Sequence, residues 1–179
     1  YLANAVNINT TLGSFELESS AWVYSFFASL IGLNGEVLWV QQPSPFGESI
    51  GDASLATGKS LIEWNGDILI GGFTRGFQDW GNSFTSELDV LGPSLFLNRI
   101  DDMGNTVNLV LSDLTNYTET IHSITPGGNG AFYLLGSVLD TLSIQGVVLP
   151  NSGRQLFLTR WNADALSTHS LSKTHLKHY

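Results

Sequence analysis

Cysteine is absent from the 179-residue chain, which excludes disulfide bonds, thiolate metal sites and cysteine nucleophiles. Basic residues are scarce, since seven Lys and Arg stand against sixteen Asp and Glu and the net charge is −9 with neutral histidine. This field repels polyanions, so the sequence excludes nucleic-acid binding and disfavours an anionic membrane surface. No apolar run approaches the roughly 18 residues of a membrane span. No signal peptide is visible and the first residue is Tyr1, so we expect a mature product or an excerpt of a longer protein.

Apolar residues, by contrast, are plentiful at 42% of the chain, while charged residues make up only 13%. This balance argues against disorder, which requires low hydrophobicity and high charge. Nineteen glycines and ten phenylalanines suit short strands separated by tight turns. No segment keeps a helical period through a capped run of about ten residues, so we expect helix in under about a tenth of the chain.

One apolar motif occurs more than once. LFLNRI at 95–100 returns as LFLTRW at 156–161, and SFFASLI from Ser25 aligns with both. In each copy an apolar run leads into a polar turn and then a second run. Because repeated residues usually serve the repeated packing, we expect burial at two equivalent positions of every copy, namely Phe26, Phe96 and Phe157, and Leu30, Ile100 and Trp161.

A second pattern follows the first two copies and contains Asn-Gly between two β-type runs. The runs after this dipeptide, ILIGG at 68–72 and YLLGS at 133–137, also match YLANA at the N-terminus, so that Tyr1 aligns with Tyr133. Asn and Gly accept the positive φ that tight hairpins need. We therefore predict hairpin turns at Asn34-Gly35, Asn65-Gly66, Gly104-Asn105 and Asn129-Gly130.

Together the two patterns predict an all-β protein made of tandem four-stranded antiparallel units of roughly 60–70 residues. Such units are typical of β-propeller blades, which favours a partial propeller or a piece of a larger one over a β-solenoid or a two-sheet sandwich. The chain divides as a single repeat array, with the end of one unit at 1–25, units at 26–95 and 96–156, and the start of a further unit at 157–179.

The order of these motifs resembles the bacterial seven-bladed β-propeller repeat. An F-x-x-x-[LIW] strand, a turn with Asn or Gly and a second strand are followed by a Gly-rich stretch, an Asn-Gly hairpin and a strand ending in Gly-Gly or Gly-Ser. The resemblance implies a secreted or cell-surface protein whose repeats have a binding or structural role. It implies no catalytic residues.

A serine motif raises the possibility of hydrolysis. GESIG at 47–51 fits the G-x-S-x-G nucleophile elbow with Ser49 as nucleophile, but that motif requires a strand before the serine and a helix after it. PSPF precedes GESIG and GDASLATGKS follows it, so the flanking sequence indicates a glycine-rich connection instead.

Metal sites are also weakly supported. His169, His175 and His178 form H-x5-H-x2-H, yet in a strand only the first two share a face, which favours a solvated tail over zinc binding. Asp101 and Asp102, with Asn105, supply too few oxygens for calcium and are better explained as turn residues. The sequence thus predicts no metal and no cofactor.

Arginine and tryptophan leave two alternatives open. Arg99 and Arg160 occupy the same repeat position, which favours pairing with a neighbouring carboxylate over ligand contact. The five tryptophans, at positions 22, 39, 64, 80 and 161, fill space between units or, where exposed, could stack on a sugar.

The sequence therefore predicts a non-catalytic, extracellular or cell-surface repeat module with a binding or structural role. A carbohydrate-binding propeller is the main alternative, and a serine hydrolase using Ser49 is a further one. We expect the partners to be other protein chains or further repeats, and possible ligands to be glycans. Unpaired strand edges invite such pairing, so the expected contact edges are the terminal strands Tyr1–Ile8 and Ser170–His178.

Overall fold

The computed structural model describes residues 1–6, 9–18, 25–45, 55–87, 93–112, 119–139, 141–144, 147–149 and 153–162. Within these ranges every regular element is a β-strand, which confirms the all-β prediction and the near absence of helix for this part of the chain. Consistently, no long apolar helix that could cross a membrane occurs among these residues.

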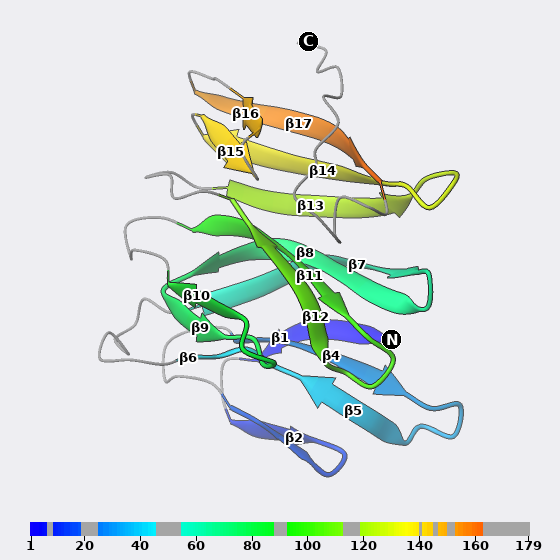
Figure 1. Ribbon diagram of the computed structural model, residues 1–179. Coiled ribbons are helices and arrows are strands. Elements are labelled where there is room, and N and C mark those ends of the chain that lie inside the picture. The colour runs from blue at the N-terminus through cyan, green and yellow to red at the C-terminus, as the bar shows by residue number, and fades with distance from the viewer. Residues whose placement is uncertain are drawn as a thin grey trace.

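Three antiparallel sheets stack one above another (Figure 1). The N-terminal sheet has the order β1-β4-β5, with β1 at Leu2–Val6, β4 at Ser25–Ile31 and β5 at Val37–Gln41. The middle sheet has the order β7-β8-β11-β12, with strands at Leu55–Trp64, Asp67–Arg75, Ser94–Ile100 and Thr106–Leu111. The C-terminal sheet has the order β13-β14-β17, with strands at Glu119–Pro126, Phe132–Leu139 and Arg154–Trp161.

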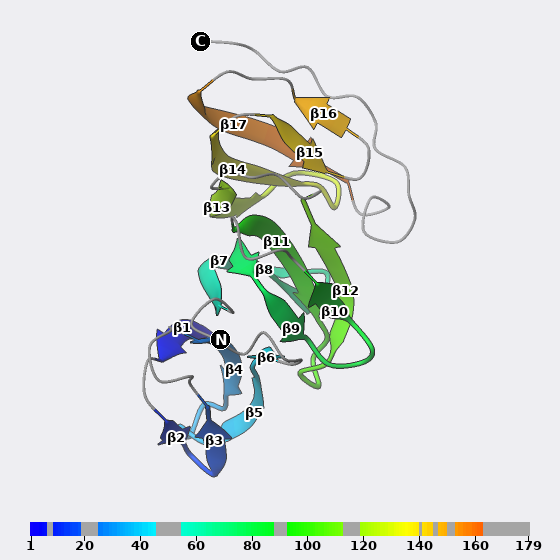
Figure 2. The ribbon, with the colours of Figure 1, turned by 90° about the vertical axis from the view of Figure 1, so that its left-hand side faces the viewer.

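A single parallel pair, Ser25 with Ala56, joins the N-terminal and middle sheets into one hydrogen-bonded network. Each sheet also carries a small two-stranded hairpin, inserted between β1 and β4, between β8 and β11, and between β14 and β17 (Figure 2). These hairpins are β2 (Thr10–Leu12) with β3 (Phe15–Leu17), β9 (Phe77–Asp79) with β10 (Thr85–Glu87), and β15 (Leu142–Ile144) with β16 (Val147–Leu149). The two-residue strand β6 (Ser44–Pro45) pairs with β9.

The four predicted hairpin turns are confirmed. Turns join β4 to β5, β7 to β8, β11 to β12 and β13 to β14 at the four expected dipeptides. The tightest has Asn65 and Gly66 alone between the paired residues Trp64 and Asp67, and their φ angles of 54° and 87° are the positive values that a two-residue hairpin favours.

The sequence alignment of the strand after each Asn-Gly turn is wrong by one residue. Phe96 pairs with Gly72, and Phe157 pairs with Gly136. These two glycines therefore occupy equivalent positions in their sheets, whereas the sequence alignment made Gly72 equivalent to Ser137. The same shift places Leu2, and not Tyr1, at the position of Tyr133. Adjacent glycines made the alignment ambiguous, and a slip of one residue exchanges the two faces of a strand.

The predicted repeat boundaries fall inside strands of the sheets. The division between residues 95 and 96 lies within β11, and the division between 156 and 157 lies within β17. The sequence period and the hydrogen-bonded sheets are therefore out of phase, because a period alone does not state where a structural unit begins.

The predicted core positions are buried with one exception. Phe26, Phe96 and Phe157 are at most 4% exposed, and Ile100 and Trp161 are also buried. Leu30 is only half-buried, so the expectation fails there, although Leu30 packs against the same buried cluster as Ile100. We call the side of each sheet that carries its repeated phenylalanine (Phe26, Phe96 or Phe157) the Phe face, and the other side the opposite face.

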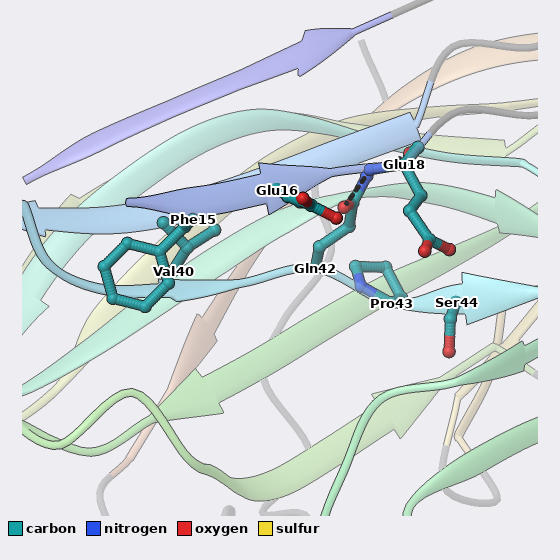
Figure 3. Close-up of a pocket in the computed structure, with 7 residues that line it drawn as sticks. All are labelled: Phe15, Glu16, Glu18, Val40, Gln42, Pro43 and Ser44. Carbon is teal, nitrogen blue, oxygen red and sulfur yellow. Dashed lines mark hydrogen bonds between the residues drawn. The ribbon is translucent and has the colours of Figure 1, made fainter. Parts of the chain in front are cut away.

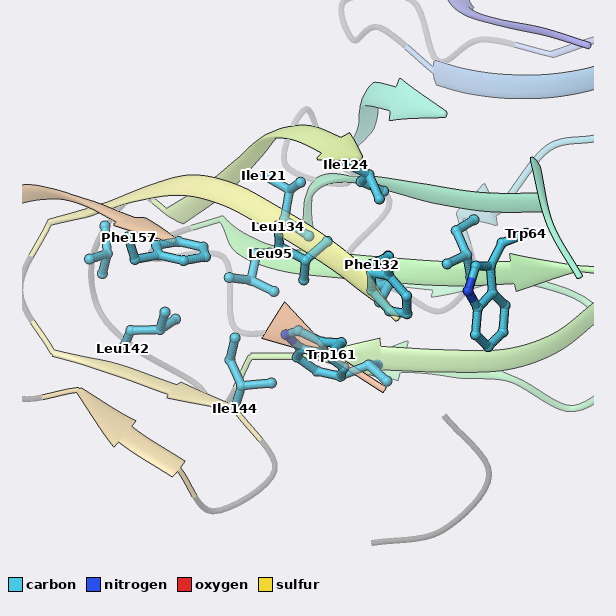
Figure 4. Packing of buried hydrophobic residues seen from close by; sticks show 14 residues of the cluster. Trp64, Leu95, Ile121, Ile124, Phe132, Leu134, Leu142, Ile144, Phe157 and Trp161 are labelled. Atoms are coloured by element: carbon cyan, nitrogen blue, oxygen red, sulfur yellow. The ribbon is translucent and has the colours of Figure 1, made fainter. Parts of the chain in front are cut away.

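The two sheet interfaces differ in the faces they use. The N-terminal and middle sheets pack Phe face to Phe face, with the rings of Phe26 and Phe96 5.9 Å apart in one buried cluster. The C-terminal sheet instead places its Phe face on the opposite face of the middle sheet, where Phe132 and Phe157 share a cluster with Leu95 (Figure 4). The middle sheet is thus covered on both sides.

Candidate functional site

The serine and histidine motifs cannot be placed. Ser49 with the whole of GESIG, and the histidines at 169, 175 and 178, lie outside the described residues. The one described histidine, His122, is exposed on β13, with Nε2 2.8 Å from Ser137 Oγ. No cluster of three or more metal-binding side chains occurs in the part of the chain that the structure describes.

Asp101 organises the turn between β11 and β12. Its Oδ1 accepts hydrogen bonds from the backbone N–H groups of Met103 (3.0 Å) and Asn105 (2.8 Å), and its Oδ2 lies 3.1 Å from Asn105 Nδ2. Burial raises the pKa of this carboxyl group, but the hydrogen bonds from Asn105, Met103 and Gly104 outweigh it and hold the pKa below its ordinary value. The turn interpretation of Asp101 and Asn105 therefore accounts for both side chains.

The two repeat arginines have different surroundings. Arg99 forms an ion pair with Asp67 on the adjacent strand β8, and its guanidinium carbon lies 5.5 Å from the centre of the Trp64 ring. Arg160 is exposed. Strand pairing makes Phe132 the equivalent of Ile68, so Ala131 stands where the middle sheet has Asp67. The predicted carboxylate partner thus exists for Arg99, and the third sheet does not repeat it.

Four of the five tryptophans are described, and all four are buried. Trp39 donates from Nε1 to the Asp102 carbonyl oxygen at 2.9 Å, and Trp64 donates to the Gly130 carbonyl oxygen at 3.0 Å. The indoles of Trp39 and Trp64 therefore each bind a hairpin turn of the next sheet along the chain. These four do not supply the exposed ring that sugar stacking would need, and Trp22 lies outside the described residues.

Glycine is required where Trp39 meets the turn. A Cβ added to Gly104 would lie 2.8 Å from the Trp39 ring, and Gly104 has a φ of 89°. Both the close approach and the left-handed backbone exclude a side chain at this position.

A buried polar network lies at the junction of the N-terminal and middle sheets. The Trp80 carbonyl oxygen accepts hydrogen bonds from Gln41 Nε2 at 2.9 Å and from Thr106 Oγ1 at 2.7 Å. Thr106 Oγ1 also lies 3.4 Å from Asn98 Nδ2, while Gln41 Oε1 and Asn98 Oδ1 have no hydrogen-bond partner. Buried polar groups without partners are uncommon, so these two oxygens mark the junction as an unusual polar feature between the two sheets.

A shallow polar groove opens beside this network. Asp79, Asn82 and Asn105 lie along it, supplied by the β9–β10 and β11–β12 turns. In the first turn Asn82 and Ser83 have φ angles of 50° and 66°, which non-glycine residues seldom adopt. The sequence analysis did not predict this loop, although the dipeptide Gly81-Asn82 is a turn signal that could have identified it.

A second groove is acidic and lies between β3 and β5 (Figure 3). Glu16 and Glu18 stand on one side of it, and Val40 and Gln42 stand on the other. Gln42 Oε1 accepts a hydrogen bond from the Glu18 backbone N–H at 3.0 Å, and Gln42 Nε2 donates to the Glu18 carbonyl oxygen. This pair fixes the hairpin of β2 and β3 along β5.

Comparisons with known proteins add no further identification. A scan against protein-family models gives no match, and a search of curated proteins finds no similar sequence. The resemblance to the seven-bladed β-propeller repeat therefore stays a prediction.

Proposed function

We propose that the chain is a non-catalytic repeat module of the β-propeller type, with a binding or structural role outside the cell or at its surface. The observation that carries this proposal is a plan that recurs in all three sheets. A small hairpin is inserted at the same place, before the strand with the repeated phenylalanine, and an apolar face packs on the neighbouring sheet. Repeat proteins of this kind use stacked units to build extended binding surfaces.

The relation between the middle and C-terminal sheets favours blade-like stacking. The Phe face of one sheet covers the opposite face of the other, which is an arrangement that further sheets could continue. The N-terminal sheet packs Phe face to Phe face and so differs from a regular blade. The location outside the cell rests on the resemblance to the seven-bladed repeat.

A fluorophosphonate probe tests the non-catalytic role. We expect the full chain to remain unlabelled, and we expect Ser49→Ala to leave the Tm and any measured activity unchanged. Labelling of the wild-type protein that disappears in Ser49→Ala, with the circular-dichroism spectrum unchanged, would replace this proposal with a serine hydrolase.

Glycan binding is a second candidate, favoured by the polar groove. Asp79, Asn82 and Asn105 line this groove with side-chain oxygens that can accept from sugar hydroxyls. Asp79 Oδ1 already accepts from the Gly81 N–H, and the amide nitrogens of Asn82 and Asn105 already donate to the Thr106 carbonyl oxygen and to Asp101. A glycan array tests it, with Asp79→Ala as the groove variant and Glu36→Ala, an exposed residue of the β4–β5 turn, as control. Binding that survives Asp79→Ala would place the glycan elsewhere.

A further inference from the structure

The opposite face of the C-terminal sheet carries a group of apolar side chains that solvent reaches. Tyr133 and Leu135 on β14 are each 39% exposed, and Leu156 and Leu158 on β17 are 73% and 60% exposed. Leu135 on β14 pairs directly with Leu158 on β17. Tyr133 lies two residues before Leu135, and Leu156 lies two residues before Leu158. These four residues form one patch, which we call the outer apolar face.

The equivalent patch on the middle sheet is completely covered. Strand pairing relates the outer apolar face to Leu69, Gly71, Leu95 and Leu97, of which the three leucines are at most 1% exposed. A Cβ on Gly71 would lie 2.9 Å from Ile121 of the C-terminal sheet, so the two sheets are in close contact there. The repeat therefore presents an apolar surface at this position that packs against a sheet wherever one is present.

We propose that the outer apolar face binds the same face of a second copy of this chain and forms a symmetric dimer. Like-face packing already occurs within the chain, where Phe26 of the N-terminal sheet meets Phe96 of the middle sheet. A second copy cannot offer a Phe face, because each of the three is buried in its own chain. Among the described residues the outer apolar face is the largest group of exposed apolar side chains on one sheet, so it is its own best partner.

The position of this face allows the contact. The C-terminal sheet stands at one end of the stack in both views, so a second copy would extend the stack beyond it (Figures 1 and 2). The paired residues Leu135 and Leu158 form an uncharged centre. Arg160 lies across from Tyr133, and Ser137, whose Oγ is 2.8 Å from His122 Nε2, lies across from Leu156. The copies pack apolar to apolar, with their charged groups at the edge.

Size and charge define how the dimer behaves. Four exposed side chains from each copy make a small interface, below the roughly 1,000 Å² that a stable complex buries. Association is therefore weak, so the dimer forms only at high protein concentration. Because each chain carries a net charge of −9, screening by salt strengthens the dimer.

Sedimentation velocity over a concentration series tests the dimer. The wild-type chain of 19.4 kDa is expected to approach about twice that mass as its concentration rises, and to do so more readily in high salt. The double variant Leu156→Asp with Leu158→Asp is expected to keep the mass of one chain. Met103→Asp, at a position 70% exposed in the β11–β12 turn, is the matched control and is expected to dimerise like the wild type.

Cross-linking gives an independent readout, since the chain has no cysteine. Leu158→Cys treated with a short bismaleimide is expected to give a covalent dimer, whereas Leu33→Cys, fully exposed in the β4–β5 turn, is expected to give far less. The double variant should keep the circular-dichroism spectrum and Tm of the wild type, because it changes only exposed side chains.

Three results overturn the proposal. One is a wild-type chain that keeps a single-chain mass at every concentration, as expected if residues 163–179 of the same chain occupy the face. The others are a double variant that still dimerises and a wild type that grows beyond the dimer. The dimer rests on the structural role proposed above, but a negative result leaves the fluorophosphonate and glycan tests unaffected.

Discussion

β11 and β17 carry nearly the same six residues and occupy different surroundings. In LFLNRI, Leu95 and Leu97 are each 1% exposed, whereas the equivalent Leu156 and Leu158 in LFLTRW are 73% and 60% exposed. The middle sheet has a neighbour on each side, while the C-terminal sheet has one described neighbour. Identical residue types can thus lie in a core or on a surface, depending on whether another sheet covers them.

The burial patterns of the strands reflect the same difference. β8 is buried without interruption from Ile68 to Gly72, while β14 alternates between buried and exposed residues from Phe132 to Gly136. Continuous burial is expected for a strand covered on both faces, and alternation for a strand covered on one. The residues of β14 nevertheless remain apolar on its exposed side, which is the unusual feature of this sheet.

The largest expected effect tests what the two strands share. Phe96→Ala and Phe157→Ala should each destabilise the chain by about 3–5 kcal/mol, because both rings are buried on a Phe face. Urea unfolding monitored by circular dichroism measures both changes. A loss under about 1 kcal/mol for Phe157 alone would mean that the two Phe faces are not equivalent in packing.

A matched leucine pair tests what the two strands do not share. Leu97→Ala should cost about 2–5 kcal/mol, since it removes buried contacts with the C-terminal sheet. Leu158→Ala should stay within about 0.5 kcal/mol at low protein concentration, since its side chain is exposed. Both are measured by the same urea experiment, and equal losses for the pair would contradict the difference in sheet coverage.

The smallest effect concerns the turns that follow the two strands. Asp101 follows β11 and hydrogen-bonds the turn, whereas Asn162 occupies the equivalent place after β17. Because the pKa of Asp101 is lowered in the folded state, its carboxylate stabilises the protein above the ordinary value of 3.8, and this contribution is lost as pH falls through the folded-state pKa.

The test is the difference in unfolding free energy between the wild type and Asp101→Asn as a function of pH. The difference should be constant near neutral pH and should shrink below about pH 4. Asn162→Ala serves as the control and should show no such dependence on pH. A difference that grew on acidification would mean that the hydrogen bonds of Asp101 do not favour its ionised form.

Sequence reasoning succeeded where the signal was local. The Asn-Gly and Gly-Asn dipeptides located four turns, and the recurrence of phenylalanine located three buried positions. It failed for the register of β14, because two neighbouring glycines in β8 allowed alternative matches that differ by one residue. It also overlooked the groove beside Asn82, whose lining comes from turns of separate strands.

The sequence by itself determined the strand character, with its two alternating faces, and the turn positions, because alternation and turn conformation depend on neighbouring residues. Only the tertiary structure decided which of those faces is covered, that Arg99 and not Arg160 meets a carboxylate, and that Trp39 and Trp64 bind the turns of the next sheet. These outcomes depend on how sheets distant in the chain stack, and nearly identical hexapeptides carry no information about their neighbours across that stack.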